Sequence, residues 1–121
     1  FKFVLLEFGI SWAQPLMWAL DREWKHLRSE LPRLKELPSE YLKRQLFYTT
    51  QPIEEPKDTR DLVQTFHAVN GNSQIMFSSD YPHWDFDNPV VILPGRDNAD
   101  LKRRILRENA LALYGQRLGL E

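Results

Sequence analysis

Three short stretches of the chain have the hydrophobic pattern of β-strands. The first six residues, Phe1–Leu6, are apolar at every position except Lys2, which predicts a parallel strand buried on both faces. Phe47–Thr50 is a run of aromatic and β-branched residues, and Gln74–Ser78 has an apolar centre. Each stretch is followed by turn or loop residues, so we predict three short strands.

A helical pattern fills the interval between the first two predicted strands. Apolar residues recur there every three or four positions, after an N-cap predicted at Ser11 and with Pro15 in the first turn. This apolar stripe consists of Leu16, Leu20, Trp24, Leu27 and Leu31. Pro32 and Pro38 interrupt the pattern, and a short helix over 39–46 then leads into the second strand.

Two further helices are predicted in the second half of the chain. One begins at a Thr59 cap and stops at Asn70-Gly71, where a left-handed residue ends the helix. After an irregular loop over 79–94, the last helix begins near Asp97 or Asn98 and ends at Gly115. The residues expected to face the core are Leu62, Val63, Phe66, Val69, Leu101, Ile105, Leu106, Ala110 and Leu113.

The alternation of strands and helices defines the predicted fold class. The order β-α-β-α-β-α indicates an α/β domain with parallel strands and right-handed crossovers. A complete (β/α)₈ barrel needs about 200–250 residues, so the chain has room for about three of its eight units. Unpaired outer strands would leave free backbone groups and apolar faces, and we therefore expect an oligomer or another partner to complete the sheet.

Composition narrows the function classes. The chain has 121 residues, with 16 Lys+Arg, 17 Asp+Glu and a net charge of −1, which argues against nucleic acid or an anionic membrane as the partner. There is no cysteine, so disulfides, zinc–thiolate sites and cysteine nucleophiles are excluded, and a cytoplasmic location is expected. No apolar run approaches the length of a membrane span.

The segments that follow the strands contain the candidate chemistry. Parallel α/β sheets bind ligands at the carboxyl ends of their strands, where loops and helix N-termini meet. Asp80 follows the third strand, and a carboxylate in that position can bind a divalent metal or accept a proton. An aspartate just beyond a strand is also a common turn or cap residue, and spacing alone does not separate the two roles.

Four other side chains belong to the same edge of the predicted sheet. His83 follows Asp80 by three residues and is either a ligand-site residue or a loop hydrogen-bonder. Glu7 ends the first strand, where it serves as a general acid or base, pairs with an arginine, or caps the next helix. Trp12 and Trp84 follow strand ends and are candidate walls of a substrate pocket.

The loop after the third strand also resembles an acidic cation site. Asp80, Asp85 and Asp87 lie close together in sequence, but the glycine and terminal glutamate of a calcium loop are missing. A small flavodoxin-like domain that binds magnesium through this loop is therefore one alternative. The chain contains no Gly-rich phosphate loop and no G-x-S-x-G, H-E-x-x-H or H-x-H motif.

Four motifs occur along nearly the whole chain: Val4–Trp12, Tyr48–Pro52, Ser78–Asp85, and Ile105–Ala110 with Leu113–Gly115. In this order they resemble the C-terminal third of the amidohydrolase-related proteins. These proteins are metal-dependent TIM barrels that include the aminocarboxymuconate-semialdehyde decarboxylase-like enzymes. The resemblance implies that the three strands are similar to barrel strands six, seven and eight.

The resemblance also implies site roles. Asp80 falls at the strand-eight aspartate of the family, which binds the catalytic metal, expected to be zinc, or handles a proton of the water bound to it. Glu7 stands where decarboxylase-like members often have histidine, which puts decarboxylation in doubt. The family's H-x-H pair and later histidine would precede Phe1. We therefore expect 1–121 to be a single C-terminal domain fragment that is incomplete and inactive alone.

Two readings of the function stay open at this point. In the first, the intact enzyme hydrolyses or decarboxylates a small carboxylate-bearing substrate, with Asp80 and Glu7 as catalytic residues and His83, Trp84 and Trp12 around the substrate. In the second, the chain is a non-catalytic module derived from the barrel, which forms a homo-oligomer or binds the missing N-terminal barrel portion.

Overall fold

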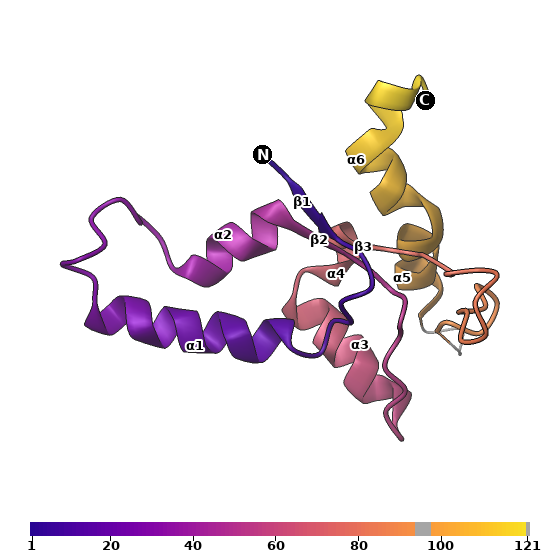
Figure 1. Ribbon diagram of the computed structural model, residues 1–121, viewed down its shortest axis with the longest axis horizontal. Coiled ribbons are helices and arrows are strands. Elements are labelled where there is room, and N and C mark those ends of the chain that lie inside the picture. The colour runs from indigo at the N-terminus through magenta and orange to yellow at the C-terminus, as the bar shows by residue number, and fades with distance from the viewer. Residues whose placement is uncertain (94–97, 121) are drawn as a thin grey trace.

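A three-stranded parallel sheet organises the molecule (Figure 1). The structure, a computed structural model, describes residues 1–93 and 98–120. Its strands are β1 (Phe3–Leu5), β2 (Leu46–Thr49) and β3 (Ile75–Met76), arranged in the order β1-β2-β3. The α/β class and the parallel pairing predicted from the sequence are confirmed. The sheet is open rather than closed, as in a partial unit of a TIM barrel.

Helices follow the first and second strands and complete the chain after the third. They are α1 (Ala13–His26), α2 (Pro38–Gln45), α3 (Thr59–Ala68), α4 (Gly71–Gln74), α5 (Ala99–Arg103), the π-helix η2 (Arg104–Glu108) and α6 (Asn109–Leu118). In Figure 1, α1 and α2 lie side by side and reach out to one side of the sheet, while α5 and α6 stand beyond β3.

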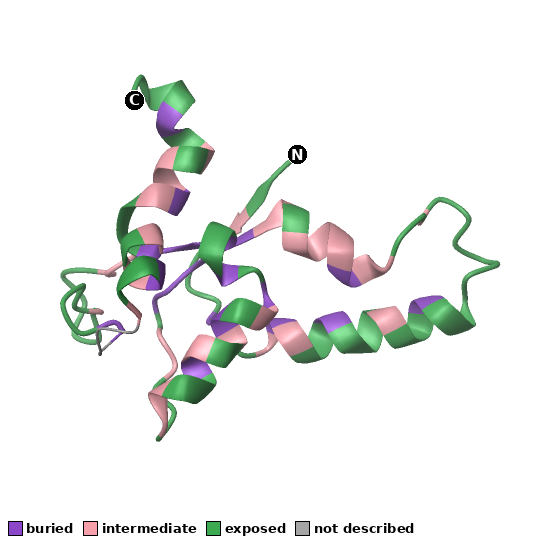
Figure 2. Ribbon diagram, turned by 180° about the vertical axis from the view of Figure 1, so that it is seen from behind, coloured by how far each residue is buried: buried purple, intermediate pink, exposed green. Residues whose placement is uncertain are grey.

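The core forms on the helix-covered face of the sheet. The register places Leu5 opposite Tyr48 and Tyr48 opposite Ile75, so these three side chains share one face. Buried residues from the loops and helices pack with them, and Figure 2 shows these buried positions on the strands and on the inner sides of the helices. The other core members are Ile10, Ala13, Met17, Leu62, Phe66, Val69, Ile92, Leu93, Leu101 and Ile105. Burial also raises the pKa of Tyr48 to about 12, which keeps its hydroxyl neutral.

The π-helix closes the outer edge of β3. In an α-helix the carbonyl of Ile105 would accept from the amide of Asn109, but here that amide donates to the carbonyl of Arg104. The Ile105 carbonyl is thereby released and accepts the backbone N–H of Phe77 at 2.9 Å. The buried side chain of Asn109 donates to the carbonyl of Ile75 at 2.7 Å. The last helical segment therefore takes the place of a fourth strand along this edge.

The opposite edge of the sheet differs from the prediction for the first strand. That strand was expected to be buried on both faces, but the side chain of Phe3 is 53% exposed and Leu6 and Phe8 are also exposed. The expectation was wrong because, of this stretch, only Leu5 packs against the core. In addition, β1 is an edge strand, and within residues 1–93 and 98–120 no strand pairs with its outer side. The predicted free edge is thus present at β1 and absent at β3.

The first helix also differs from the predicted one. It ends at His26 rather than continuing to Leu31, and the four leucines of the predicted stripe are exposed. Ala13, Met17 and Trp24 are buried instead, so only Trp24 of the stripe was predicted correctly. The reason is tertiary: the predicted leucine face meets no neighbouring element, whereas the adjacent face meets the core and α2.

Helix ends were predicted within a few residues, but their capping residues were often different. Asp58, not Thr59, is the N-cap of α3 and accepts from the backbone N–H of Arg60. Asn70 supplies the left-handed stop after α3, with φ of 62°. The last helix ends at Gly119 with φ of 64°, four residues beyond the predicted Gly115.

Asn98 is the N-cap of α5, as predicted. The other predicted position, Asp97, lies outside the described residues, as does Pro94 at the end of the predicted loop.

Candidate functional site

Hydroxyl groups tie the carboxyl ends of the strands together. The backbone N–H of Thr50 donates to the carbonyl of Met76 at 2.9 Å, which extends the β2–β3 pairing by one residue. The Thr50 hydroxyl accepts from the backbone N–H of Ser78 at 3.2 Å and donates to its carbonyl at 3.3 Å. The Thr49 hydroxyl donates to the Leu5 carbonyl at 3.4 Å. This polar edge is where the sequence predicted the site.

Asp80 and His83 form a pair at the exit of β3. His83 Nδ1 lies 2.9 Å from Asp80 Oδ2, and the backbone N–H of His83 donates to the Asp80 carbonyl at 2.9 Å. Asp80 itself has φ of 57°, a left-handed conformation that aspartate tolerates better than most residues. The Asp80 side chain is 20% exposed and that of His83 68%. The turn therefore brings two predicted site residues together.

Asp85 joins this pair to make a group of three metal-ligand side chains. One ligand atom from each of Asp80, His83 and Asp85 lies within 4.8 Å of the others. Around tetrahedral zinc, oxygen and nitrogen ligands at about 2.0–2.2 Å from the metal lie about 3.3–3.6 Å apart, so the exposed side chains of His83 and Asp85 would have to adjust their positions around Asp80 to bind one zinc ion. The donor set, one imidazole and two carboxylates, fits a divalent metal such as zinc.

Of the other predicted site residues, Glu7 and Trp12 belong to the segment after β1, whereas Trp84 lies between His83 and Asp85 in the chain. Glu7 is exposed and its backbone N–H donates to the hydroxyl of Thr49 at 3.4 Å. Trp12 is half-buried, donates from Nε1 to the carbonyl of Phe8 at 2.9 Å, and its ring packs edge-on against that of Tyr48. The side chain of Trp84 is 93% exposed. Their catalytic and substrate-binding roles stay predictions.

Glu54 is a structural residue of this edge that the sequence analysis did not single out. Its Oε1 accepts the backbone N–H groups of Ile10 and Ser11, both at 2.7 Å. The N-cap of α1 is Trp12, which makes no side-chain capping bond, so the N-cap predicted at Ser11 was wrong. Glu54 instead holds the two backbone amides in the loop just before the helix. Burial raises the pKa of Glu54, but the hydrogen bonds from Ser11 and Ile10 outweigh it and leave the pKa below its ordinary value. A glutamate between prolines carries no sequence signal for this contact.

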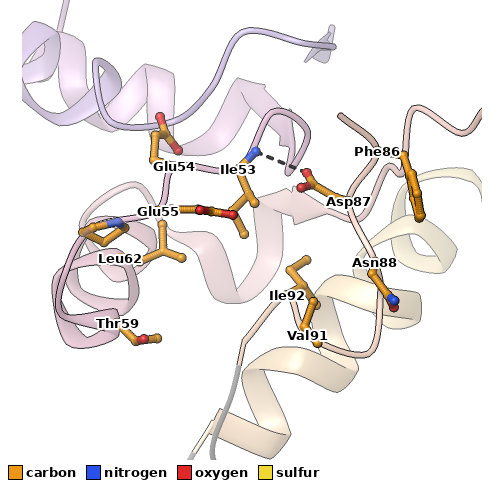
Figure 3. Close-up of a pocket in the computed structure, with 11 residues that line it drawn as sticks. Ile53, Glu54, Glu55, Thr59, Leu62, Phe86, Asp87, Asn88, Val91 and Ile92 are labelled. Carbon is orange, nitrogen blue, oxygen red and sulfur yellow. Dashed lines mark hydrogen bonds between the residues drawn. The ribbon is translucent and has the colours of Figure 1, made fainter. Parts of the chain in front are cut away.

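A cavity of about 380 Å³ lies between the loop after β2 and the loop after β3 (Figure 3). Asp87 crosses between the two loops: its Oδ2 accepts the backbone N–H of Ile53 at 3.2 Å, and its own N–H donates to the Ser79 carbonyl. Burial raises the pKa of Asp87, and the negative charges of Glu55 and Asp85 add to the rise. The sequence analysis named Asp87 as acidic but did not predict this bridging role.

An open parallel sheet with helices, and a group of side chains able to hold a metal ion after β3, is the arrangement of a partial TIM-barrel unit. The family comparison agrees. The amidohydrolase family model matches residues 1–116, and the chain belongs to the amidohydrolase family, within a superfamily of metal-dependent hydrolases. A search of curated proteins finds no match to the chain. Within the described residues, no helix has the length and apolar character needed to cross a membrane.

Proposed function

We propose that this chain supplies the strand-end aspartate of a metal-dependent enzyme that hydrolyses or decarboxylates a small carboxylate-bearing substrate. The observation that carries the proposal is the Asp80–His83 pair at the exit of β3, with a ligand atom of Asp85 within 4.8 Å. The family match over nearly the whole chain supports the same reaction class. The proposed metal is zinc, because the donors are one imidazole and two carboxylates.

Each residue of the pair has a distinct part in the proposed reaction. Asp80 holds the metal or accepts a proton during the reaction, and its position is set by the left-handed turn. His83 orients the Asp80 carboxylate through Nδ1 and, with Trp84, faces the open side where a substrate arrives. A bound divalent metal would supply Lewis-acid polarisation of the substrate and a nucleophile at neutral pH.

Within this class, Glu7 favours hydrolysis over decarboxylation. The decarboxylase-like members often have histidine at the position of Glu7, and a carboxylate there cannot be a neutral metal ligand. Glu7 is exposed just after β1, at the carboxyl-terminal end of the strands like Asp80, where it can serve as a second polar group for the substrate. The decarboxylase-like subtype is therefore the less favoured form of the proposal.

We further propose that this chain alone has little or no turnover. Three protein ligands with one open position are normal for catalytic zinc, and the group here is mostly exposed to solvent, which weakens metal binding. The other two histidines, His26 and His67, lie in the last turns of α1 and α3, away from the strand exits. Additional ligands from other protein segments would complete a catalytic centre.

Metal titration tests the proposed site directly. Zinc binding to metal-stripped protein is measured by calorimetry for the wild type, for Asp80→Asn and for the control Asp61→Asn, which removes one charge from α3. We expect zinc binding to weaken by about tenfold or more in Asp80→Asn and to be unchanged in Asp61→Asn. Equal zinc binding by all three proteins contradicts the proposal.

The open edge of β1 supports a second candidate function, as an assembly module. The chain exposes 8529 Å² of surface, whereas a compact monomer of 14.4 kDa exposes about 6,800 Å². The excess is about 1,700 Å². This area exceeds the roughly 800 Å² that each partner buries in a standard protein–protein interface. We propose that a second copy or another part of a barrel covers β1, where Phe3, Leu6 and Phe8 are exposed.

A further inference from the structure

The cavity between the loops after β2 and β3 has the size and walls of a site for a small organic molecule. Its volume, about 380 Å³, falls within the range of ligand pockets. Apolar side chains from both loops and from α3 form most of its walls, and Figure 3 shows them around the central space. They are Ile53, Leu62, Phe86, Val91 and Ile92. Apolar walls suit the hydrocarbon part of an organic molecule, whereas a small inorganic cation needs oxygen ligands.

The charged groups around this cavity are carboxylates of a single sign. Glu55 and Asp87 line it, and no lysine or arginine does so within the described residues. Figure 3 draws both carboxylates on the same side of the cavity, above Ile92 and Val91, and like charges placed on one wall repel each other. Glu54 also lines it, but its carboxylate is directed to the backbone amides before α1.

Two carboxylates elsewhere on the chain, in contrast, are paired with arginine side chains. Asp58 is paired with Arg60, and Asp100 is paired with Arg104 at 2.8 Å and with Arg103. Glu55 has no such cation partner within the described residues, and Asp87 has one backbone N–H. A positively charged group placed between Glu55 and Asp87 would relieve their repulsion and form charge-assisted hydrogen bonds to both.

From this combination we infer that the cavity binds a small organic cation, a primary ammonium group carried on a compact apolar body. The ammonium lies between the carboxylates of Glu55 and Asp87, and the apolar body lies against Leu62 and Ile92. None of Asp80, His83 and Asp85 lines the cavity, so the inference does not depend on the proposed metal chemistry.

The direct test is a titration of the full chain followed by NMR, with benzylammonium as the probe. Benzyl alcohol and benzoate serve as neutral and anionic probes with the same ring. We expect saturable shifts of Leu62, Phe86 and Ile92 with benzylammonium, binding at least about tenfold weaker with benzyl alcohol, and no binding of benzoate. Equal binding of the ammonium and the alcohol would show that the carboxylates recognise no charge and would overturn the inference.

Paired variants test the two carboxylates. Glu55→Gln and Asp87→Asn remove one charge each, and the asparagine can still accept the N–H of Ile53. Asp61→Asn is the matched control, because Asp61 does not line this cavity. We expect each cavity variant to weaken benzylammonium binding about tenfold and the control to leave it unchanged. Full displacement of benzylammonium by stoichiometric magnesium would identify a metal site instead and would also overturn the inference.

Discussion

The two edges of the sheet satisfy the same backbone requirement in different ways. At β3, the carbonyl freed by the π-helix and the buried amide of Asn109 bond to the outer backbone groups. At β1, the side chain of Phe3 is exposed and, among the described residues, no strand pairs along the outer side. A strand edge can therefore be closed within one chain by a helical irregularity, whereas an edge without that device needs another strand.

Substitution of Asn109 has the largest expected effect because it reopens the closed edge. In Asn109→Ala, the carbonyl of Ile75 loses its donor in a buried environment, and we expect the free energy of unfolding to fall by about 2–3 kcal/mol. Urea denaturation followed by circular dichroism measures this change. The exposed Asn72 provides the control, because Asn72→Ala should change the free energy by less than about 0.5 kcal/mol. Equal effects of the two substitutions would show that the Asn109 contact does not stabilise the edge.

Gly9 tests the connection between β1 and the rest of the sheet. It has φ of 63°, and a Cβ there would lie 2.8 Å from Oε1 of Glu54, the atom that accepts the backbone N–H groups of Ile10 and Ser11. Gly9→Ala should therefore lower the free energy of unfolding by about 2 kcal/mol, because of backbone strain and displacement of the Glu54 carboxylate. Gly119 has nearly the same φ and open space around it, so Gly119→Ala should cost only about 1 kcal/mol. Thermal unfolding compares the two, and a Gly9 cost no larger than that of Gly119 argues against the Glu54 contact.

The same contact predicts how stability depends on pH. Since the pKa of Glu54 is lower in the folded chain than its ordinary value of 4.5, its stabilisation is present above that pH. It is lost as the pH falls below 4.5 and through the folded-state pKa, because protonation weakens the acceptor for the amides of Ile10 and Ser11. The free energy of unfolding, measured between pH 7 and pH 3, should therefore fall less steeply for Glu54→Gln than for the wild type. Parallel curves for the two proteins would contradict this assignment.

The open edge gives the prediction with the smallest effect on folding. Phe3→Lys places a charge on an exposed position of β1, so the free energy of unfolding should change by less than about 0.5 kcal/mol. Self-association, in contrast, should fall strongly, because a lysine on an edge strand opposes strand addition. Analytical ultracentrifugation over a range of concentrations measures it, with Trp18→Lys on exposed α1 as the control. A wild-type chain that is monomeric at all concentrations contradicts an association surface at β1.

Local sequence patterns were sufficient for the elements and for part of the site. Strands, helices and their parallel order followed from hydrophobic runs and turn residues. The spacing of three residues placed His83 near Asp80 at the exit of the third strand, and the structure adds the hydrogen bond between them. The buried face of α1 was predicted wrongly. The buried face of an amphipathic helix depends on the elements that pack against it, and these lie far away in sequence.

The tertiary contacts at the strand ends were beyond the reach of sequence analysis. Glu54 accepts from Ile10 and Ser11 over a separation of more than 40 residues, and Asp87 reaches Ile53 over 34. Carboxylates in loops are common, and nothing in their neighbours distinguishes one that bridges two loops from one that faces water.

Hydrophobic periodicity and turn chemistry act over a few residues, and they were enough to predict the α/β class, the parallel order of the strands and the position of Asp80 at a strand exit. The closed edge of the sheet, the buried face of α1 and the carboxylates around the cavity became apparent only in the folded chain. These features depend on hydrogen bonds and packing between distant segments, whose free energy exists only after the chain has folded.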